Sequence, residues 1–182
     1  MKEIRIHGRG GQGGVTAARM LASAFVTEGK SVASFPMYGF ERRGAPVQAF
    51  TRFDDKPIRE KTQVYFPDCM VVIDPTLLKI DTLFSGLKPN GILIVNSPNF
   101  NTRADKNLAV AGVIDATKIA VEEIGRDIPN TCLLGAFAAT TQWVKLESII
   151  KALADYLSGD MLKRNTRSVE RGFKEVKVLK WQ

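Results

Sequence analysis

A glycine-rich segment near the N-terminus has the residue types and spacing that bind phosphate groups. Gly8, Gly10 and Gly13 satisfy the pattern G-x-G-x-x-G, and residues 2–7 before them alternate between polar and apolar side chains, as in a strand. Residues 15–28 after the glycines are rich in Ala, Leu and Met, which favours a helix. A helix that begins in a glycine loop offers unpaired N–H groups and the positive end of its dipole. We therefore expect an anion, or a closely packed backbone, at this loop.

A dinucleotide-binding domain needs a further residue that this sequence does not supply. An acidic side chain about 20 residues beyond the glycines, at the end of the second strand, holds the ribose hydroxyls. Here the second predicted strand, Ser31 to Phe35, leads into Pro36, and the first carboxylate is Glu41 within a loop. NAD or FAD binding is therefore disfavoured, and a stand-alone NAD(P)-type reductase is kept only as an alternative. Two other interpretations of the glycine loop remain. It binds a phosphate-bearing ligand or a partner's backbone, or it only turns the chain and packs the helix against the strand.

A charged cluster follows the second strand. Glu41, Arg42 and Arg43 lie in the predicted loop Met37 to Pro46, which we expect at the same sheet edge as the glycine loop. Because charged side chains are costly to bury unpaired, the cluster faces water, a ligand or another subunit.

Other kinds of site are poorly supported. His7 is the only histidine, which nearly excludes a histidine-based triad or a site with several histidine ligands. Cys69 and Cys132 lie far apart with no C-x-x-C motif, so they predict neither an iron–sulfur nor a zinc site. Each is expected to be a buried small apolar residue. We predict no catalytic residue and no metal ligand.

Length, composition and charge indicate a single domain spanning residues 1–182. The chain is 45% hydrophobic and 25% charged, with a net charge of +7. Residues 161–182 carry seven basic and two acidic side chains, but no nucleic-acid-binding motif accompanies them, so we expect no nucleic-acid partner. Apolar residues at helical spacing predict instead a helix docked by one face. No stretch of about 20 apolar residues and no leader is evident, so we expect a cytoplasmic protein without membrane contact.

The pattern of elements predicts an α/β fold, in which strands and helices alternate around a mainly parallel sheet. Further strands are predicted at 47–53, 69–73, 91–95 and 108–114, a short helix at 82–87, and an extended piece near Ile58. From Ala116 onward the pattern is helical. We expect one three-layer, Rossmann-like domain with a helical C-terminus.

Several blocks of the sequence together resemble the gamma subunits, or gamma domains, of the 2-oxoacid:ferredoxin oxidoreductases, closest to pyruvate:ferredoxin oxidoreductase. The blocks are His7 to Gly14, Tyr38 to Val47, Asp68 to Leu77, Asn130 to Ala136 and Asn165 to Gly172. They follow the family's order over essentially the whole chain. Phe40 departs from the family, in which many members have Pro before the Glu, and we expect only a local change of the loop.

The resemblance implies one subunit of a larger enzyme that is inactive alone. Such complexes decarboxylate a 2-oxoacid oxidatively with coenzyme A, giving an acyl-CoA, carbon dioxide and reduced ferredoxin. It implies thiamine diphosphate and magnesium in alpha and beta subunits, and four-iron four-sulfur clusters in a delta subunit. This chain would hold no cofactor by itself. The sequence does not select among pyruvate, 2-oxoisovalerate and 2-oxoglutarate as the substrate, and it does not give the direction of the reaction.

The resemblance also suggests a role for the loops, in binding coenzyme A and in assembly with the alpha, beta and delta subunits. Guanidinium groups bind phosphate oxygens bidentately, so Arg9, Arg42 and Arg43 suit the phosphates of coenzyme A. An ion-pair network between subunits is an equally good interpretation of Glu41, Arg42 and Arg43. The candidate residues for coenzyme A or interface contact are Arg9, Gly10, Gly11, Gln12, Gly13, Glu41, Arg42 and Arg43.

Overall fold

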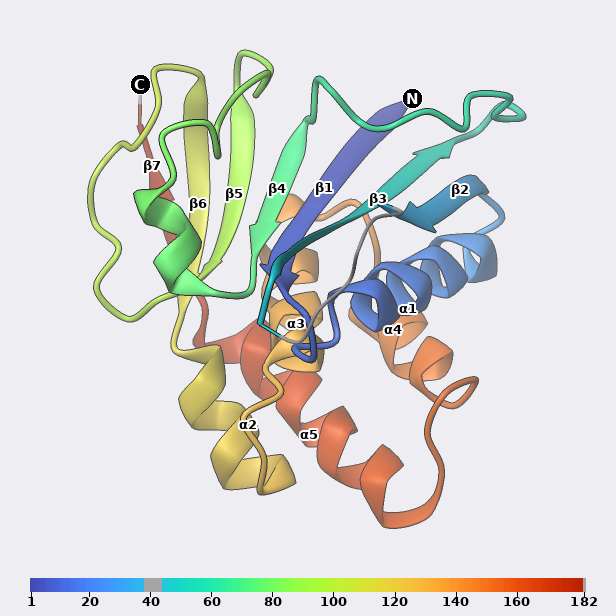
Figure 1. Ribbon diagram of the computed structural model, residues 1–182. Coiled ribbons are helices and arrows are strands. Elements are labelled where there is room, and N and C mark those ends of the chain that lie inside the picture. The colour runs from blue at the N-terminus through green and yellow to red at the C-terminus, as the bar shows by residue number, and fades with distance from the viewer. Residues whose placement is uncertain (38–43, 182) are drawn as a thin grey trace.

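Seven strands form one sheet in the computed structural model, which describes residues 1–37 and 44–181 (Figure 1). The strands are β1 (Lys2–Arg9), β2 (Ser31–Pro36), β3 (Pro46–Asp54), β4 (Cys69–Val72), β5 (Gly91–Asn96), β6 (Leu108–Ile114) and β7 (Lys177–Lys180). Their order across the sheet is β2-β3-β1-β4-β5-β6-β7. The N-terminal strand therefore lies in the interior of the sheet.

The centre of the sheet is parallel and its flanks are antiparallel. Strands β1, β4, β5 and β6 pair in parallel, whereas β3 runs antiparallel to both β1 and β2, and β7 runs antiparallel to β6. All four residues of β4 are buried, as expected for a central strand whose two faces are both covered. The predicted α/β fold is confirmed, as a mixed sheet whose central strands are parallel.

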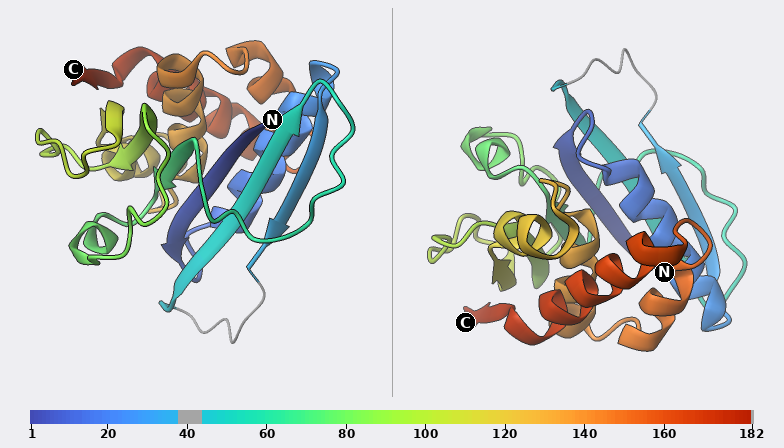
Figure 2. Two further views of the ribbon diagram at one scale, coloured as in Figure 1. Left: turned by 90° about the horizontal axis from the view of Figure 1, so that it is seen from above. Right: turned by 90° about the horizontal axis from the view of Figure 1, so that it is seen from below.

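All the α-helices of the described chain lie on one side of the sheet (Figures 1 and 2). They are α1 (Gly14–Thr27), α2 (Ala116–Ile124), α3 (Asn130–Thr141), α4 (Leu146–Leu153) and α5 (Gly159–Glu175). Helices α1 and α3 pack directly on the strands, and α2, α4 and α5 pack against these two helices from outside. The main core lies between them and includes Ile4, Ile6, Leu21, Phe25 and Leu134.

The opposite face of the sheet is covered by a short 3₁₀ helix, η1 (Pro75–Lys79), and by turns and coil (Figure 2), so the third layer of the predicted three-layer domain contains no α-helix in the described chain. A second core there joins Met70 and Leu93 of the sheet to Leu77, Leu83 and Leu87. The predicted helix at 82–87 is wrong, because residues 81–86 form hydrogen-bonded turns. Gly86 takes a positive φ of 79°, and a side chain there would collide with the backbone oxygen of Tyr65.

Helix α3 is enclosed on nearly all sides, and ten of its twelve residues are buried. It crosses α5 so closely that a Cβ on Gly135 would collide with the carbonyl oxygen of Val169. A Cβ on Gly172 of α5 would likewise collide with the carbonyl oxygen of Cys132. The two glycines therefore let the two helix backbones approach each other directly.

Most predicted elements are present within two residues of their expected ends. The amphipathic C-terminal helix is α5, which buries Val169 and leaves its charged side chains outside, where Arg171 pairs with Glu122 and Glu123 of α2. Both cysteines are fully buried, as predicted. Strand β7 has no counterpart among the predicted elements, and the described residues around Ile58 form no strand.

Candidate functional site

The glycine loop connects β1 to α1 and leaves the first turn of this helix open. Gly11 and Gly13 have φ angles of 98° and 77°, which L side chains rarely adopt. Gly13 is the N-cap of α1, so the helix begins without a side-chain cap, and its first turn contains no acidic residue. The first N–H groups therefore have neither a capping side chain nor a carboxylate beside them.

Asn130, the first residue of α3, contacts the glycine loop. Asn130 is 6% exposed, and its Nδ2 donates a hydrogen bond to the carbonyl oxygen of Gly13 over 3.2 Å. A Cβ on Gly13 would lie only 2.5 Å from the same nitrogen. Glycine is therefore required at residue 13 both by its backbone conformation and by its neighbour.

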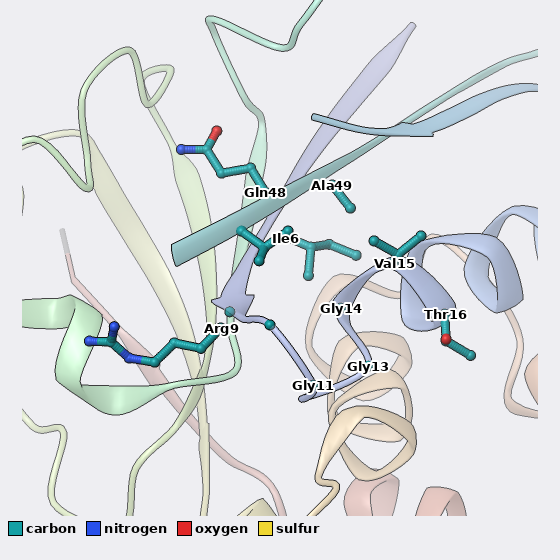
Figure 3. Close-up of a pocket in the computed structure, with 12 residues that line it drawn as sticks. Ile6, Arg9, Gly11, Gly13, Gly14, Val15, Thr16, Gln48 and Ala49 are labelled. Atoms are coloured by element: carbon teal, nitrogen blue, oxygen red, sulfur yellow. The ribbon is translucent and has the colours of Figure 1, made fainter. Parts of the chain in front are cut away.

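A pocket of about 280 Å³ lies at the N-terminus of α1, between the glycine loop and strand β3 (Figure 3). Backbone from Gly8 to Gly14 forms one wall, and Val47 and Ala49 contribute to the other. Ile6, Val15 and Thr16 also line it. The site thus combines backbone N–H donors with an apolar wall, an arrangement suited to a phosphate with an organic group attached.

The side chain of Arg9 is directed away from this pocket, towards η1 (Figure 3). Its Nη2 donates to Thr76 Oγ1 over 2.8 Å, and its Nε lies 3.2 Å from Asp74 Oδ2. Gln12 joins the same network, because its Nε2 donates to Asp74 Oδ2 and its Oε1 accepts from the backbone N–H of Arg9. The network ties the glycine loop to the loop that follows β4.

The carboxylate of Asp74 is the centre of this network and has a lowered pKa. Its partial burial raises the pKa, but hydrogen bonds from Thr76 and Gln12 and the charge of Arg9 lower it by more. Asp74 is also the N-cap of η1, with Oδ1 accepting from the backbone N–H of Thr76 over 2.9 Å. It is therefore an ionised anchor that holds Arg9 and Gln12 in place.

The glycine loop also contacts the end of the loop that carries the predicted charged cluster. Gly10 donates its N–H to the carbonyl oxygen of Ala45 over 2.9 Å, and Gly44 donates to that of Gly10 over 3.2 Å. Arg9 Nη1 donates to the carbonyl oxygen of Gly44. The end of this loop is thus a neighbour of the glycine loop. Glu41, Arg42 and Arg43 themselves lie outside the described residues.

Two residues of the site are not recognisable from local spacing. In the sequence Asn130 stands out only within the family block Asn130 to Ala136. Asp74 lies in the block Asp68 to Leu77 and directly follows a predicted strand, so it is expected at the same sheet edge as the glycine loop, although its contact with Gln12 is not predicted. Each contacts the glycine loop from more than 60 residues away along the chain, and local spacing does not report such a contact.

Metal binding finds no support among residues 1–37 and 44–181. No group of three His, Cys, Asp or Glu side chains is close enough to hold an ion. Burial raises the pKa of the Cys69 thiol well above its ordinary value and that of Cys132 to about 12. A four-iron cluster takes four thiolates, so the two buried thiols do not fit one.

Within residues 1–37 and 44–181, no helix is both long and apolar enough to cross a membrane.

Comparison with known proteins identifies the family. The family model for pyruvate ferredoxin/flavodoxin oxidoreductase matches residues 3–175. The common gamma subunit of the pyruvate/ketoisovalerate oxidoreductases of Thermococcus litoralis is 50% identical over 182 residues, covering 98% of each chain. The gamma subunit of an NADH-dependent phenylglyoxylate dehydrogenase from Aromatoleum evansii is 48% identical, covering 98% of this chain and 95% of that one.

A solved structure agrees with these sequence relatives. The crystal structure of pyruvate oxidoreductase subunit PORC from Thermotoga maritima superimposes with a TM-score of 0.86 at 42% identity, covering 97% of both chains. The resemblance to gamma subunits that the sequence blocks suggested is therefore confirmed. This chain belongs to the pyruvate ferredoxin/flavodoxin oxidoreductase family and is a gamma-type subunit of an oxidoreductase complex.

Proposed function

We propose that this subunit helps to bind coenzyme A within a cytoplasmic 2-oxoacid:ferredoxin oxidoreductase, and that the glycine loop is its contact with a phosphate group. The partners in this proposal are alpha, beta and delta subunits and ferredoxin. Thiamine diphosphate, magnesium and four-iron four-sulfur clusters belong to the partner subunits. This chain supplies backbone donors and charge, and no catalytic side chain.

The uncapped N-terminus of α1 is the observation that carries the proposal. The positive end of its dipole and its first N–H groups border a pocket whose described lining contains no carboxylate. The nearby acid Asp74 is engaged by Arg9, Gln12 and Thr76. An anion entering the pocket would therefore meet donors without a competing negative charge.

The 2-oxoacid is proposed only as a class. Relatives of nearly equal identity belong to enzymes named for pyruvate and ketoisovalerate and for phenylglyoxylate. Because these acids differ greatly in size, the similarity of this chain to its relatives does not select among them. We infer that the pocket for the acid is built mainly by the other subunits.

A pair of substitutions at one residue tests the phosphate contact. Thr16 is exposed in the first turn of α1 and lines the pocket. Thr16→Glu should place a carboxylate where the phosphate is proposed to bind, and should raise the KM for coenzyme A about tenfold or more in the assembled complex. The KM for the 2-oxoacid should stay unchanged. Thr16→Gln, which adds similar bulk without charge, is the matched control, and equal KM values for the two variants would refute the phosphate contact.

The arginines of the charged cluster are tested separately. Arg42→Ala or Arg43→Ala in the complex should raise the KM for coenzyme A more than that for the 2-oxoacid. Loss of one charge-assisted bond costs about 1.5–3 kcal/mol, equivalent to about ten- to a hundredfold in affinity. Arg19→Ala, an exposed arginine further along α1, is the control. A complex that dissociates on gel filtration but keeps normal coenzyme A kinetics would assign the two arginines to an interface.

A further inference from the structure

A second pocket lies on the opposite face of the sheet from the glycine loop. It has a volume of about 250 Å³ and is lined by residues of β1, β3, η1 and the turns after η1. Arg5 and His7 reach it from β1, where they alternate with Ile6, which faces the helices and the first pocket. The structure brings into this pocket two nitrogen-bearing side chains, both more than nine-tenths buried, that the proposed function does not use.

Arg5 is a buried cation with no carboxylate partner among the described residues. Its side chain is held by the protein backbone, because Nη2 donates to the carbonyl oxygens of Leu83 and Ser85 over 2.9 and 2.8 Å. Its Nε donates to His7 Nε2 over 2.9 Å. Burial lowers the pKa of Arg5, but arginine remains charged at neutral pH. Its Nη1 has no hydrogen-bond partner within residues 1–37 and 44–181.

His7 presents a second donor to the same cavity. Because Nε2 accepts the bond from Arg5, the proton of the neutral ring is on Nδ1, which has no partner in the described chain. Burial, and then the charge of Arg5, lower the pKa of His7 to about 3, so the ring is neutral at physiological pH. The pair therefore carries one positive charge in total. A buried positive charge without a counter-charge is costly, which favours an anion beside it.

The rest of the lining is suited to a short organic acid. Gln48 and Thr82 add polar groups, and Leu77 and Leu83 are apolar and buried. A cavity of about 150 Å³ accommodates benzene, so this one has room for a carboxylate with a chain of a few carbons. One positive charge matches a monoanion, whereas a doubly charged phosphate would bring an unbalanced negative charge into the protein.

We propose that the Arg5 and His7 pocket binds the carboxylate of a small monocarboxylic acid. The guanidinium Nη1 and the imidazole Nδ1–H donate to the two carboxylate oxygens, and the leucines contact the chain of the acid. The charged residues of this site are not those of the glycine loop. Its test is therefore independent of coenzyme A.

Because the chain has only one histidine, His7 itself reports on the pocket. The 182-residue chain is titrated with propionate at constant ionic strength, while the ring signals of His7 are followed by ¹H–¹³C NMR. Propionate should shift these signals with saturation, and neutral propionamide of the same shape should not. Equal effects of the two probes, or no saturable shift, would overturn the proposal, as would tighter binding of inorganic phosphate.

Two variants identify where the probe binds. Arg5→Gln removes the charge and should weaken propionate binding at least tenfold. Since Arg5 also holds the turns at Leu83 and Ser85, a second variant is needed in case this one fails to fold. Thr82 is exposed at the pocket, so Thr82→Phe should fill the cavity and abolish the shift with the rest of the spectrum unchanged. Undiminished binding to a folded Thr82→Phe variant would show that the acid binds elsewhere.

Discussion

The substitution Gly13→Ala tests whether the glycine loop is held by its contact with α3. The φ angle of 77° costs an alanine about 1–2 kcal/mol, and the new Cβ would lie 2.5 Å from Asn130 Nδ2. Moving that amide breaks its 3.2 Å bond to the carbonyl oxygen of Gly13 and strains a buried side chain, for a further loss of about 1–3 kcal/mol. We therefore expect the free energy of unfolding in urea to fall by about 2–5 kcal/mol.

Gly29→Ala is the matched control, because Gly29 has nearly the same φ angle, 78°, and a Cβ added there would meet no atom within 4 Å. It should cost the conformational part alone, so the difference between the two variants isolates the contact with Asn130. In an Asn130→Ala background, Gly13→Ala should cost no more than Gly29→Ala. Equal losses for Gly13→Ala and Gly29→Ala in the natural background would refute the reasoning.

Three further outcomes are expected. The pKa of His7 is lowered from 6.5 to about 3 in the folded chain, so between these two pH values the unfolded chain binds more protons than the folded chain. The free energy of unfolding should therefore fall as the pH drops from 6.5 to about 3, by up to about 1.4 kcal/mol per pH unit. An imidazole ring that titrates near pH 6.5 by NMR would contradict this. Gly135→Ala should lower the free energy of unfolding by about 1–3 kcal/mol, because its Cβ collides with the Val169 carbonyl of α5, and an unchanged urea midpoint would show that the helices separate freely. The chain purified alone should show neither an iron–sulfur absorption band nor oxidation of a 2-oxoacid, and a brown, iron-containing preparation would contradict the assignment of the clusters to partner subunits.

The elements that can be predicted best from the sequence are the central strands, which have apolar surroundings on both faces of the sheet. Residues 69–72 and 91–96 are nearly continuous apolar runs because β4 and β5 lie in the middle of the sheet, and both match their expected ends within one residue. Strand β7 escapes prediction because it is a four-residue edge strand with three exposed side chains. The turns at 81–86 resemble a helix in sequence because their apolar residues pack on the sheet at a spacing that suits a helix as well.

The candidate site is predictable only in its local part. The glycine spacing and the helix after it locate the loop, since both belong to one short segment. The direction of the Arg9 side chain is not predictable, because Asp74 and Thr76 bind it from more than 60 residues away. The burial of Arg5 and His7 cannot be predicted from the sequence either, because their alternation with Ile4 and Ile6 is typical of a strand whose polar side faces water.

The enclosure of α3 ties the unfolding of this helix to the unfolding of the whole chain. A helix between a sheet and a second helix, with two glycines bringing the helix backbones together, cannot detach without exposing most of the main core. Its amide protons should therefore exchange with deuterium only when the whole chain unfolds, whereas those of the edge strands β2 and β7 exchange through small local fluctuations. The exchange rates within Asn130–Thr141 thus measure the global stability of the subunit directly, without denaturant.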